Sequence, residues 1–427
     1  MLLSNVRPLR ETNTISRSWQ GLSVLTESHE VVGSSAGFDI RFKYLVINAG
    51  ISRFGLASFN LIVIWIILFE TKNAFLAGLG DGILSLPLFF SFIIGALIDK
   101  ATNKRLISIL VSVLRAVFLV SVLYGFYIQS LSVILISIYA SGFMLGLTSD
   151  IINSVRATWT KELLTKDQYK SGSSISSMAS YIAEGAGYLL SGIILILGFY
   201  HSFEVLIAVF AIALIPLLFI STEFKPDETS ALQSMKDGIS FIRKHKEMAQ
   251  LMIIVLVVNI TFGMMGIILI SLVQIKFHLP SFYASIVFSM FILGLILGSG
   301  FGTKVKGKLG SISMAIFLVT GISIASISFI NSIFLIFVPS IIIGVLIGIA
   351  NVLYNSSMLQ LVSQEFMARI SGAFSTFSVA ATFSSGMLGG AIIQLTSVTD
   401  SFLIVGLFVI ASIVLWPIFR ELYIIVV

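Results

Sequence analysis

Apolar runs long enough to cross a lipid bilayer follow one another along this chain from residue 42 to its end. A membrane helix needs about 20 consecutive apolar residues. Runs of that kind, separated by short polar breaks, occupy residues 44–69, 76–98, 106–128, 131–153, 173–198, 203–221, 249–274, 281–303, 311–330, 333–355, 371–396 and 401–423. With 57% hydrophobic and 11% charged residues, the chain is also far too apolar for a soluble domain. The sequence therefore predicts an all-α integral membrane protein with twelve transmembrane helices.

The basic residues indicate how these helices are oriented. Of 26 Lys and Arg residues, 22 fall in the N-terminal segment or in breaks on one side of the membrane, and only Lys72 and Lys276 fall on the other. Because positively charged loops remain in the cytosol, both termini are predicted to be cytosolic, with the protein in the cell (plasma) membrane. The net charge of +6 is thus a signal of topology and gives no support to a nucleic-acid partner.

Two polar segments divide the chain. Residues 1–41 lack the apolar core and cleavage site of a signal peptide and are expected to form a mobile cytosolic tail. The longest break, 222–248, separates a six-helix bundle at 42–221 from a second one at 249–427. Within this cytosolic linker, apolar residues recur at helical spacing and predict an amphipathic helix on the membrane surface: Leu232, Met235, Ile239 and Ile242.

The two predicted bundles resemble each other in sequence. A shift of 198 residues places Asn153 on Asn351, Leu190 on Leu388 and Gly192 on Gly390. Transporters are commonly built from such repeated bundles, with a binding site between them. We therefore expect two pseudo-repeated six-helix bundles.

The first polar break inside the N-terminal bundle carries a recognisable pattern: Gly95, then Asp99 and Lys100, then Lys104 and Arg105. This stretch resembles the loop signature of the major facilitator superfamily, although Thr102 stands where a glycine is usual. The resemblance implies the twelve-helix fold of that family and secondary transport by alternating access. It also implies a gating clasp at Asp99, and we place Asp150 and Arg156 in the same cytosolic network.

Two further stretches resemble the macrolide-efflux and siderophore-exporter branch of that superfamily. They are Ile51-Ser52-Arg53-Phe54-Gly55 and the run from Asn153 to Ala157 followed by Glu162-Leu-Leu. This resemblance implies proton-driven export of amphiphilic compounds. In the fifth predicted helix, Tyr188 follows Gly187 where drug antiporters of the superfamily carry proline.

Charged residues within the predicted spans indicate where coupling takes place, because each costs about 2.5–3.5 kcal/mol at a helix centre. The candidates for proton coupling are Glu184, Asp81, Arg115 and Arg53. Glu184 and Arg115 lie about ten residues into helices that enter from the cytosol, so they are expected to lie at similar depth and to be able to pair. A fixed structural ion pair is the alternative, and Arg53 and Arg115 are also candidates for binding an anionic substrate.

Aromatic, methionine and amide side chains are the candidates for the substrate cavity. Methionine and aromatic surfaces adapt to varied apolar ligands, although such residues also pack against helices and lipid. The candidates are Tyr181, Tyr188, Asn259, Met264, Met265, Asn351, Tyr354, Asn355 and Phe377.

Enzymatic and metal chemistry find no support in the sequence. The chain has no cysteine, and its four histidines show no metal-ligand spacing. The stretch from Gly302 to Lys308 resembles a phosphate-binding loop but continues with Leu309 instead of Ser or Thr. No enzymatic activity, cofactor or metal is therefore expected.

The sequence predicts a monomeric secondary transporter whose partners are the bilayer, a small-molecule substrate and the proton gradient. Proton-coupled efflux of amphiphilic molecules, drug-like or siderophore-like, is the favoured function. Uptake or symport of a small organic anion is the alternative, as is a non-transporting sensor or scramblase on the same scaffold.

Overall fold

The computed structural model describes residues 38–425 apart from 92–93, 95–97, 99–100, 102, 221–239, 241, 243–244 and 363. Ten of the described helices are long and apolar enough to cross a membrane, and two shorter apolar segments, Ala74–Phe90 and Val398–Val414, complete a set of twelve. The predicted all-α membrane fold is therefore confirmed. Most of the predicted tail and linker lies outside the described residues, including Leu232, Met235 and Ile239 of the predicted amphipathic helix.

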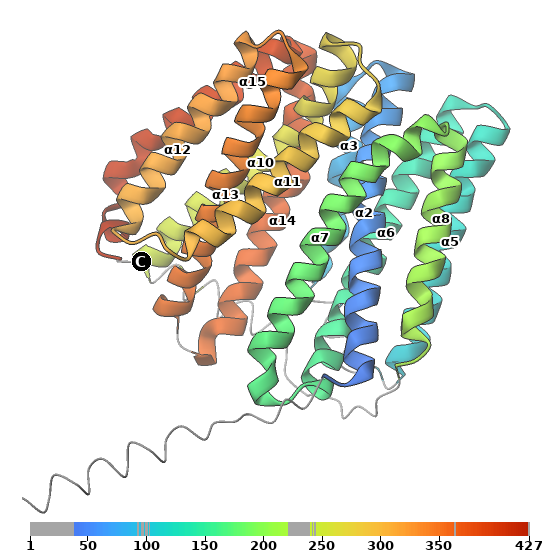
Figure 1. Cartoon of the computed structure of the whole chain (residues 1–427), viewed down its shortest axis with the longest axis horizontal. Helices are drawn as coiled ribbons and strands as arrows, with labels where there is room; N and C mark the ends of the chain where they lie inside the picture. The colour runs from blue at the N-terminus through green and yellow to red at the C-terminus, as the bar shows by residue number, and fades with distance from the viewer. Residues whose placement is uncertain are drawn as a thin grey trace, which may run out of the picture. The chain divides into compact units, whose positions relative to one another are not determined.

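The helices form two six-helix bundles, drawn blue to green and yellow to red in Figure 1. The first comprises α2 (Ile40–Thr71), α3 (Ala74–Ser85) with the 3₁₀ turn η2 (Leu86–Phe90), α5 (Lys104–Tyr127), α6 (Leu131–Leu163), α7 (Tyr169–Ile196) and α8 (Phe199–Leu217). The second comprises α10 (Lys246–Ser271) with the π turn η4 (Leu272–Lys276), α11 (Ser281–Gly302), α12 (Leu309–Ser326) with η5 (Ile327–Phe329), α13 (Ile333–Leu361), α14 (Gln364–Leu395), and α15 (Val398–Ala411) with η6 (Ser412–Ile418) and η7 (Arg420–Tyr423).

Capping side chains set the ends of the helices that carry the site. After Thr71 the chain turns through Lys72, which has a positive φ of 53°, and Asn73 then accepts hydrogen bonds from the backbone N–H groups of Phe75 and Leu76. Such a cap pairs donors that the first turn of a helix cannot pair internally. Farther along, Pro87 has no backbone N–H, and the helix continues there as a 3₁₀ turn. Asp81 and Ser85 are thus held in the short regular segment between cap and proline.

Glycines bring helices together within the C-terminal bundle. On α11, Gly294 and Gly298 face Gly344 and Gly348 of α13, and a Cβ atom on any of the four would overlap with the backbone of the other helix. Small residues at a spacing of four allow this close approach, which stabilises helix pairs where no water is available to be displaced. The α11–α13 pair is therefore a tightly packed unit.

The two bundles meet through α3 with α14 and α7 with α11. A Cβ on Gly78 would overlap with the carbonyl oxygen of Gly386, while Ser281 Oγ donates to Gly192 O at 3.1 Å and Gln274 Nε2 donates to Trp65 O at 3.3 Å. These contacts lie toward the side where α2 ends and α3 begins, which we call the turn face. The side where α2 begins is called the start face. The described conformation is closed at the turn face.

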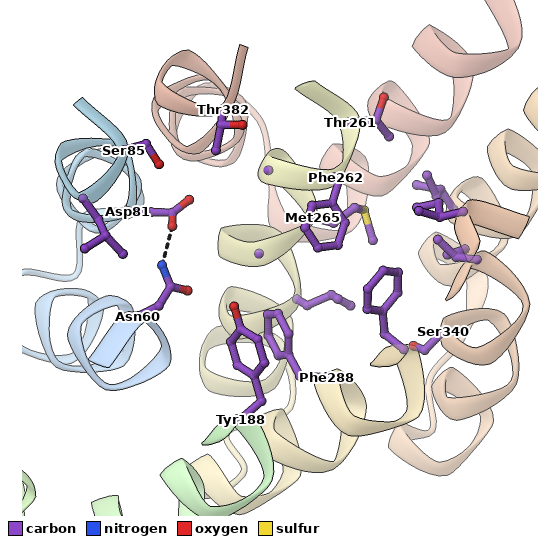
Figure 2. A pocket seen from close by; sticks show the side chains of 18 of the residues that line it. Asn60, Asp81, Ser85, Tyr188, Thr261, Phe262, Met265, Phe288, Ser340 and Thr382 are labelled. Carbon is purple, nitrogen blue, oxygen red and sulfur yellow. Dashed lines mark hydrogen bonds between the residues drawn. The ribbon is translucent and has the colours of Figure 1, made fainter. Parts of the chain in front are cut away.

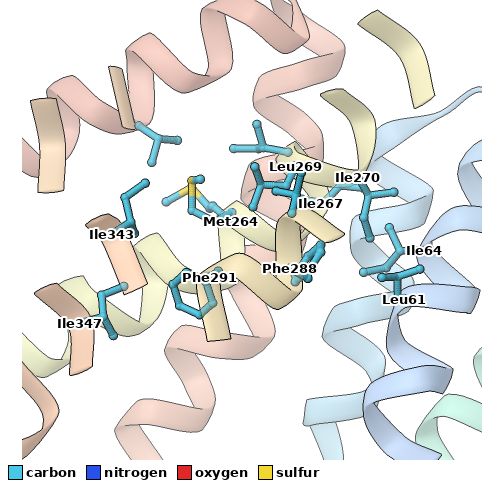
Figure 3. Close-up of a cluster of buried hydrophobic side chains, with 14 of the residues drawn as sticks. Leu61, Ile64, Met264, Ile267, Leu269, Ile270, Phe288, Phe291, Ile343 and Ile347 are labelled. Carbon is cyan, nitrogen blue, oxygen red and sulfur yellow. The ribbon is translucent and has the colours of Figure 1, made fainter. Parts of the chain in front are cut away.

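Buried apolar side chains continue across this contact. Figure 3 shows Leu61 and Ile64 of α2 beside Ile267 and Ile270 of α10, with Phe288 of α11 next to them. All five are at most 7% exposed. The seal at the turn face is therefore formed by apolar packing and close backbone contact.

Candidate functional site

A cavity of about 250 Å³ lies between the two bundles, on the start-face side of the seal. Helices α2, α3 and α7 form one wall, and α10 to α14 form the other. Figure 2 shows side chains from both bundles pointing into this space. The polar residues of the first wall are Arg53, Asn60, Asp81, Ser85 and Tyr188.

Helical spacing explains how the polar wall forms. Arg53 and Asn60 are seven residues apart on α2, and Asp81 and Ser85 are four apart on α3, so each pair shares one face of its helix. Asn60 Nδ2 donates a hydrogen bond to Asp81 Oδ1 at 2.5 Å, which joins the two helices (Figure 2). The amide holds the carboxyl group of Asp81 at the edge of the cavity.

The second wall is apolar. Phe262 and Met265 of α10 and Phe288 and Phe291 of α11 line it, and Tyr188 stacks on Phe288 with 5.0 Å between ring centroids. Thr261 and Thr382 add hydroxyl groups, but each donates to the backbone of its own helix. This wall therefore offers a ligand mainly apolar and aromatic surface.

A second cavity, of about 310 Å³, lies within the N-terminal bundle and shares Arg53, Asn60, Leu84, Ser85 and Tyr188 with the first. Glu184 lines it, together with Ser149 and Asn153 of α6 and Leu88 of η2. Along their helices, Leu88 and Asn153 lie nearer the start face than Asp81 does. The two cavities thus adjoin, and we call them together the path from the centre toward the start face.

Of the four predicted coupling residues, the structure brings three to this path. Asp81 lines the central cavity, Glu184 lines the second cavity, and Arg53 lines both. Arg115 lies elsewhere and is 2% exposed. Its Nε and Nη2 donate to Thr148 Oγ1 at 2.7 Å and Ser149 Oγ at 2.8 Å, and its guanidinium lies 5.3 Å from the ring centroid of Phe210. The expected pairing of Arg115 with Glu184 is not present.

Of the predicted substrate residues, Tyr188 and Met265 line the central cavity. Met264 and Tyr354 are buried among apolar side chains, and Asn259 bonds to Val255 O and Ser378 Oγ. Tyr181, Asn351 and Asn355 are exposed, and Phe377 is half-buried. None of these seven lines either cavity in this conformation, so their role in substrate binding stays a prediction.

The predicted gating residues are only partly described. Gly95, Asp99 and Lys100 lie outside the described residues. Lys104 is buried and its Nζ donates to Ala101 O at 3.2 Å, whereas Arg105 is exposed. Asp150 is buried and Arg156 half-buried on α6. The clasp at Asp99 therefore stays a prediction.

Several lining residues were missed by the sequence analysis: Asn60, Ser85, Phe288, Phe291 and Ser340. Asn60 could have been predicted from the sequence, because this amide lies two helical turns after Arg53 in a mostly apolar stretch. Ser85 likewise follows Asp81 by one turn. The phenylalanines carried no comparable signal, because every predicted span contains apolar residues.

The arrangement suits reversible binding of a ligand with both polar and apolar parts. Its described residues include one arginine, two carboxyl groups, two amides and several aromatic rings. Among the described residues, no group of three or more His, Cys, Asp or Glu side chains could hold a metal ion.

Comparisons with known proteins agree on the fold. A family model described as Major Facilitator Superfamily matches residues 45–386. Similar solved structures include a POT family transporter in complex with 5-aminolevulinic acid (TM-score 0.69, 15% identity, 89% of this chain and 96% of that one) and the nucleoside transporter NupG (0.68, 15%, 90% and 99%). A bacterial homologue of the human lysosomal transporter Spinster, described as inward-facing and unoccupied, is also similar (0.68, 12%, 91% and 97%). Among curated protein sequences, no significant match was found.

Proposed function

The chain belongs to the Major Facilitator Superfamily, and from this premise we propose that it is a proton-coupled exporter of amphiphilic small molecules that works by alternating access. It is a multi-pass membrane transporter and not an enzyme. The observation that carries the proposal is the two-sided central cavity, with Asp81 and Asn60 on one wall and Phe262, Met265 and Phe288 on the other.

The charges along the path favour a cationic or neutral amphiphile over an anion. Among the described lining residues there are two carboxyl groups, on Asp81 and Glu184, and one guanidinium, on Arg53. Arg115 was the other candidate for binding an anion, but it is buried between α5, α6 and α8 and lines neither cavity. Of the two arginines predicted to bind an anion, only Arg53 therefore lines the cavities.

Coupling to protons follows from competition for the same carboxyl group. An ionised carboxylate in the membrane interior attracts a cationic ligand, and protonation removes that attraction. Asp81 borders the space for the ligand, while Glu184 lies on the path toward the start face. We infer that Asp81 exchanges a proton for the ligand and that Glu184 passes protons to and from the start face.

The proposed direction of transport rests on the predicted topology and on the resemblance to exporters of the superfamily. The distribution of basic residues predicts a cytosolic start face, and with that orientation a conformation closed at the turn face exchanges its ligand with the cytosol. Such a conformation loads the ligand of an exporter and releases the ligand of an importer, and the resemblance to exporters favours the first.

The test is flux of a fluorescent lipophilic cation in proteoliposomes under an imposed pH gradient. We expect native protein to accumulate the dye only with the gradient, Asp81→Asn to abolish this accumulation, and Glu184→Gln to reduce it about tenfold. Two matched changes at exposed sites, Asp400→Asn and Glu204→Gln, should leave flux near the native rate.

Other results would separate the alternatives. Dye flux that needs no pH gradient, or that is unchanged in Asp81→Asn, would contradict proton coupling at Asp81. Flux of an anionic dye that is lost in Arg53→Gln, with no flux of the cation, would instead identify an organic-anion transporter.

A further inference from the structure

A groove separate from the transport path runs along the outside of the C-terminal bundle. It has a volume of about 580 Å³, and α12 lies beside α15 along its length (Figure 1). Met314 and Leu318 of α12 form one wall, and Ile410, Ile413 and Val414 form the other. Trp416, Arg420 and Tyr423 line its end at the start face.

The end of the groove is held in place by specific contacts. Trp416 Nε1 donates to Gly310 O at 2.8 Å, and the indole packs on Phe317 with 5.1 Å between ring centroids. The ring of Tyr423 lies against Gly310, where a Cβ would come within 2.8 Å of it, and its hydroxyl donates to Met314 Sδ at 3.8 Å. The turns η6 and η7 are therefore anchored to the first two turns of α12.

The walls reach well into the apolar part of the membrane. Leu318 lies nine residues beyond the start of α12, which is about 13 Å along a helix. Met314, Leu318 and Val414 are 40%, 41% and 78% exposed although all three are large and apolar. In a bilayer these exposed surfaces contact acyl chains.

Positive charge gathers at the mouth of the groove. Arg420 lines it, and Lys304, Lys306 and Lys308 are exposed in the turn between α11 and α12. A backbone hydrogen bond of 2.9 Å from Leu309 N to Ile425 O joins this turn to the C-terminal segment. Across residues 303–309 and 420–425 there are four cations and a single acid, Glu421.

We propose that this groove binds one anionic phospholipid, with an acyl chain between α12 and α15 and the phosphate headgroup beside Arg420 and Lys308. The apolar walls contact the acyl chain, and the cations at the level of the headgroups favour an anionic lipid. Basic residues next to the membrane surface attract anionic lipids. The inference does not depend on what the transporter carries.

The absence of cysteine in the chain allows the groove to be labelled at one position. A Leu318→Cys variant would carry an environment-sensitive fluorophore in the groove, and a Val113→Cys variant would carry it on α5. Both positions are exposed and lie nine residues from the start of a helix that begins at the start face. The purified, delipidated full chain is then titrated with quencher-labelled phosphatidylglycerol or phosphatidylcholine of the same chain length.

We expect phosphatidylglycerol to quench the label at position 318 at a concentration about tenfold lower than phosphatidylcholine, with no such preference at position 113. In the Leu318→Cys variant, Lys308→Gln and Arg420→Gln should each raise the concentration of phosphatidylglycerol needed for quenching about fivefold. Lys161→Gln, an exposed cation at the end of α6 on the same face, should have no effect.

Two outcomes would overturn the proposal. Equal quenching by both lipids at position 318 would show that the groove binds lipids regardless of headgroup charge. An equal preference for phosphatidylglycerol at positions 113 and 318 would show a general attraction to the whole start face. Gel filtration of each variant checks that replacement of the exposed Lys308 and Arg420 leaves the folded state intact.

Discussion

At the scale of single residues, the charges inside the membrane have two different roles. Arg53, Asp81 and Glu184 line cavities, and no ion pair joins them in the described part of the chain. Charged groups in the membrane interior are tolerated where they face water or a partner. Arg115 is instead enclosed by Thr148, Ser149 and Phe210 and ties three helices together.

This difference predicts the effect of a conservative change. Arg115→Lys keeps the charge but loses the planar group that donates to two hydroxyls and lies near Phe210. We expect the free energy of unfolding to fall by about 2 kcal/mol, measured by thermal unfolding in detergent. Arg105→Lys, at an exposed position of the same helix, should change it by less than about 0.5 kcal/mol. Dye binding that weakens in Arg115→Lys without loss of stability would argue for a role in the site.

Residue patterns in the sequence predicted this site only in part. Charged residues are rare within apolar spans, so Arg53, Asp81 and Glu184 could be identified without a structure. The sequence favoured Glu184 for coupling because it lies deep in its helix, whereas the structure places Asp81 at the central cavity, held there by Asn60. That contact joins different helices, and one sequence does not reveal how helices are rotated against each other.

At the scale of helices, apolar length was a reliable guide. The predicted spans 44–69 and 333–355 correspond to α2 and α13, which extend beyond them by a few residues. The π turn Leu272–Lys276 was not predicted, because its residues contain no glycine or proline to mark a change of helix geometry. The sequence also does not show which helices of one bundle contact helices of the other. A glycine at a close helix contact cannot be told from a glycine that faces lipid.

The contact between α3 and α14 gives a second prediction. Gly78→Val would place side-chain atoms where the carbonyl of Gly386 lies, so the turn face should fail to close. Ser285, which is fully buried at the α7–α11 contact, provides a reporter when changed to cysteine. We expect its reaction with a membrane-impermeant maleimide to rise about tenfold in Gly78→Val.

The control for this experiment is Gly300→Val on α11, because a Cβ at Gly300 meets no atom within 4 Å. The labelling rate of Ser285→Cys in the Gly300→Val variant should match its rate in the otherwise native chain. If Gly78→Val remains folded and its labelling does not change, close backbone contact is not what seals this face.

At the scale of the whole molecule, orientation remains to be tested. The exposed positions Asn331 and Lys306 flank opposite ends of α12. In intact cells, an impermeant maleimide should label Asn331→Cys, whereas Lys306→Cys should react only after the membrane is permeabilised. The reverse pattern would contradict cytosolic termini and would mean that the described conformation is open to the outside of the cell.

The division of the central cavity between a charged wall and an apolar wall has a consequence for how such a protein can evolve. Changes in Phe262, Met265 or Phe288 alter the shape offered to a ligand while leaving Asp81 and Asn60 untouched. Under the proposed coupling at Asp81, new ligands can therefore be acquired through one bundle while the energy source stays fixed by the other. Substitutions confined to the C-terminal half of the chain would then change which substrates are transported.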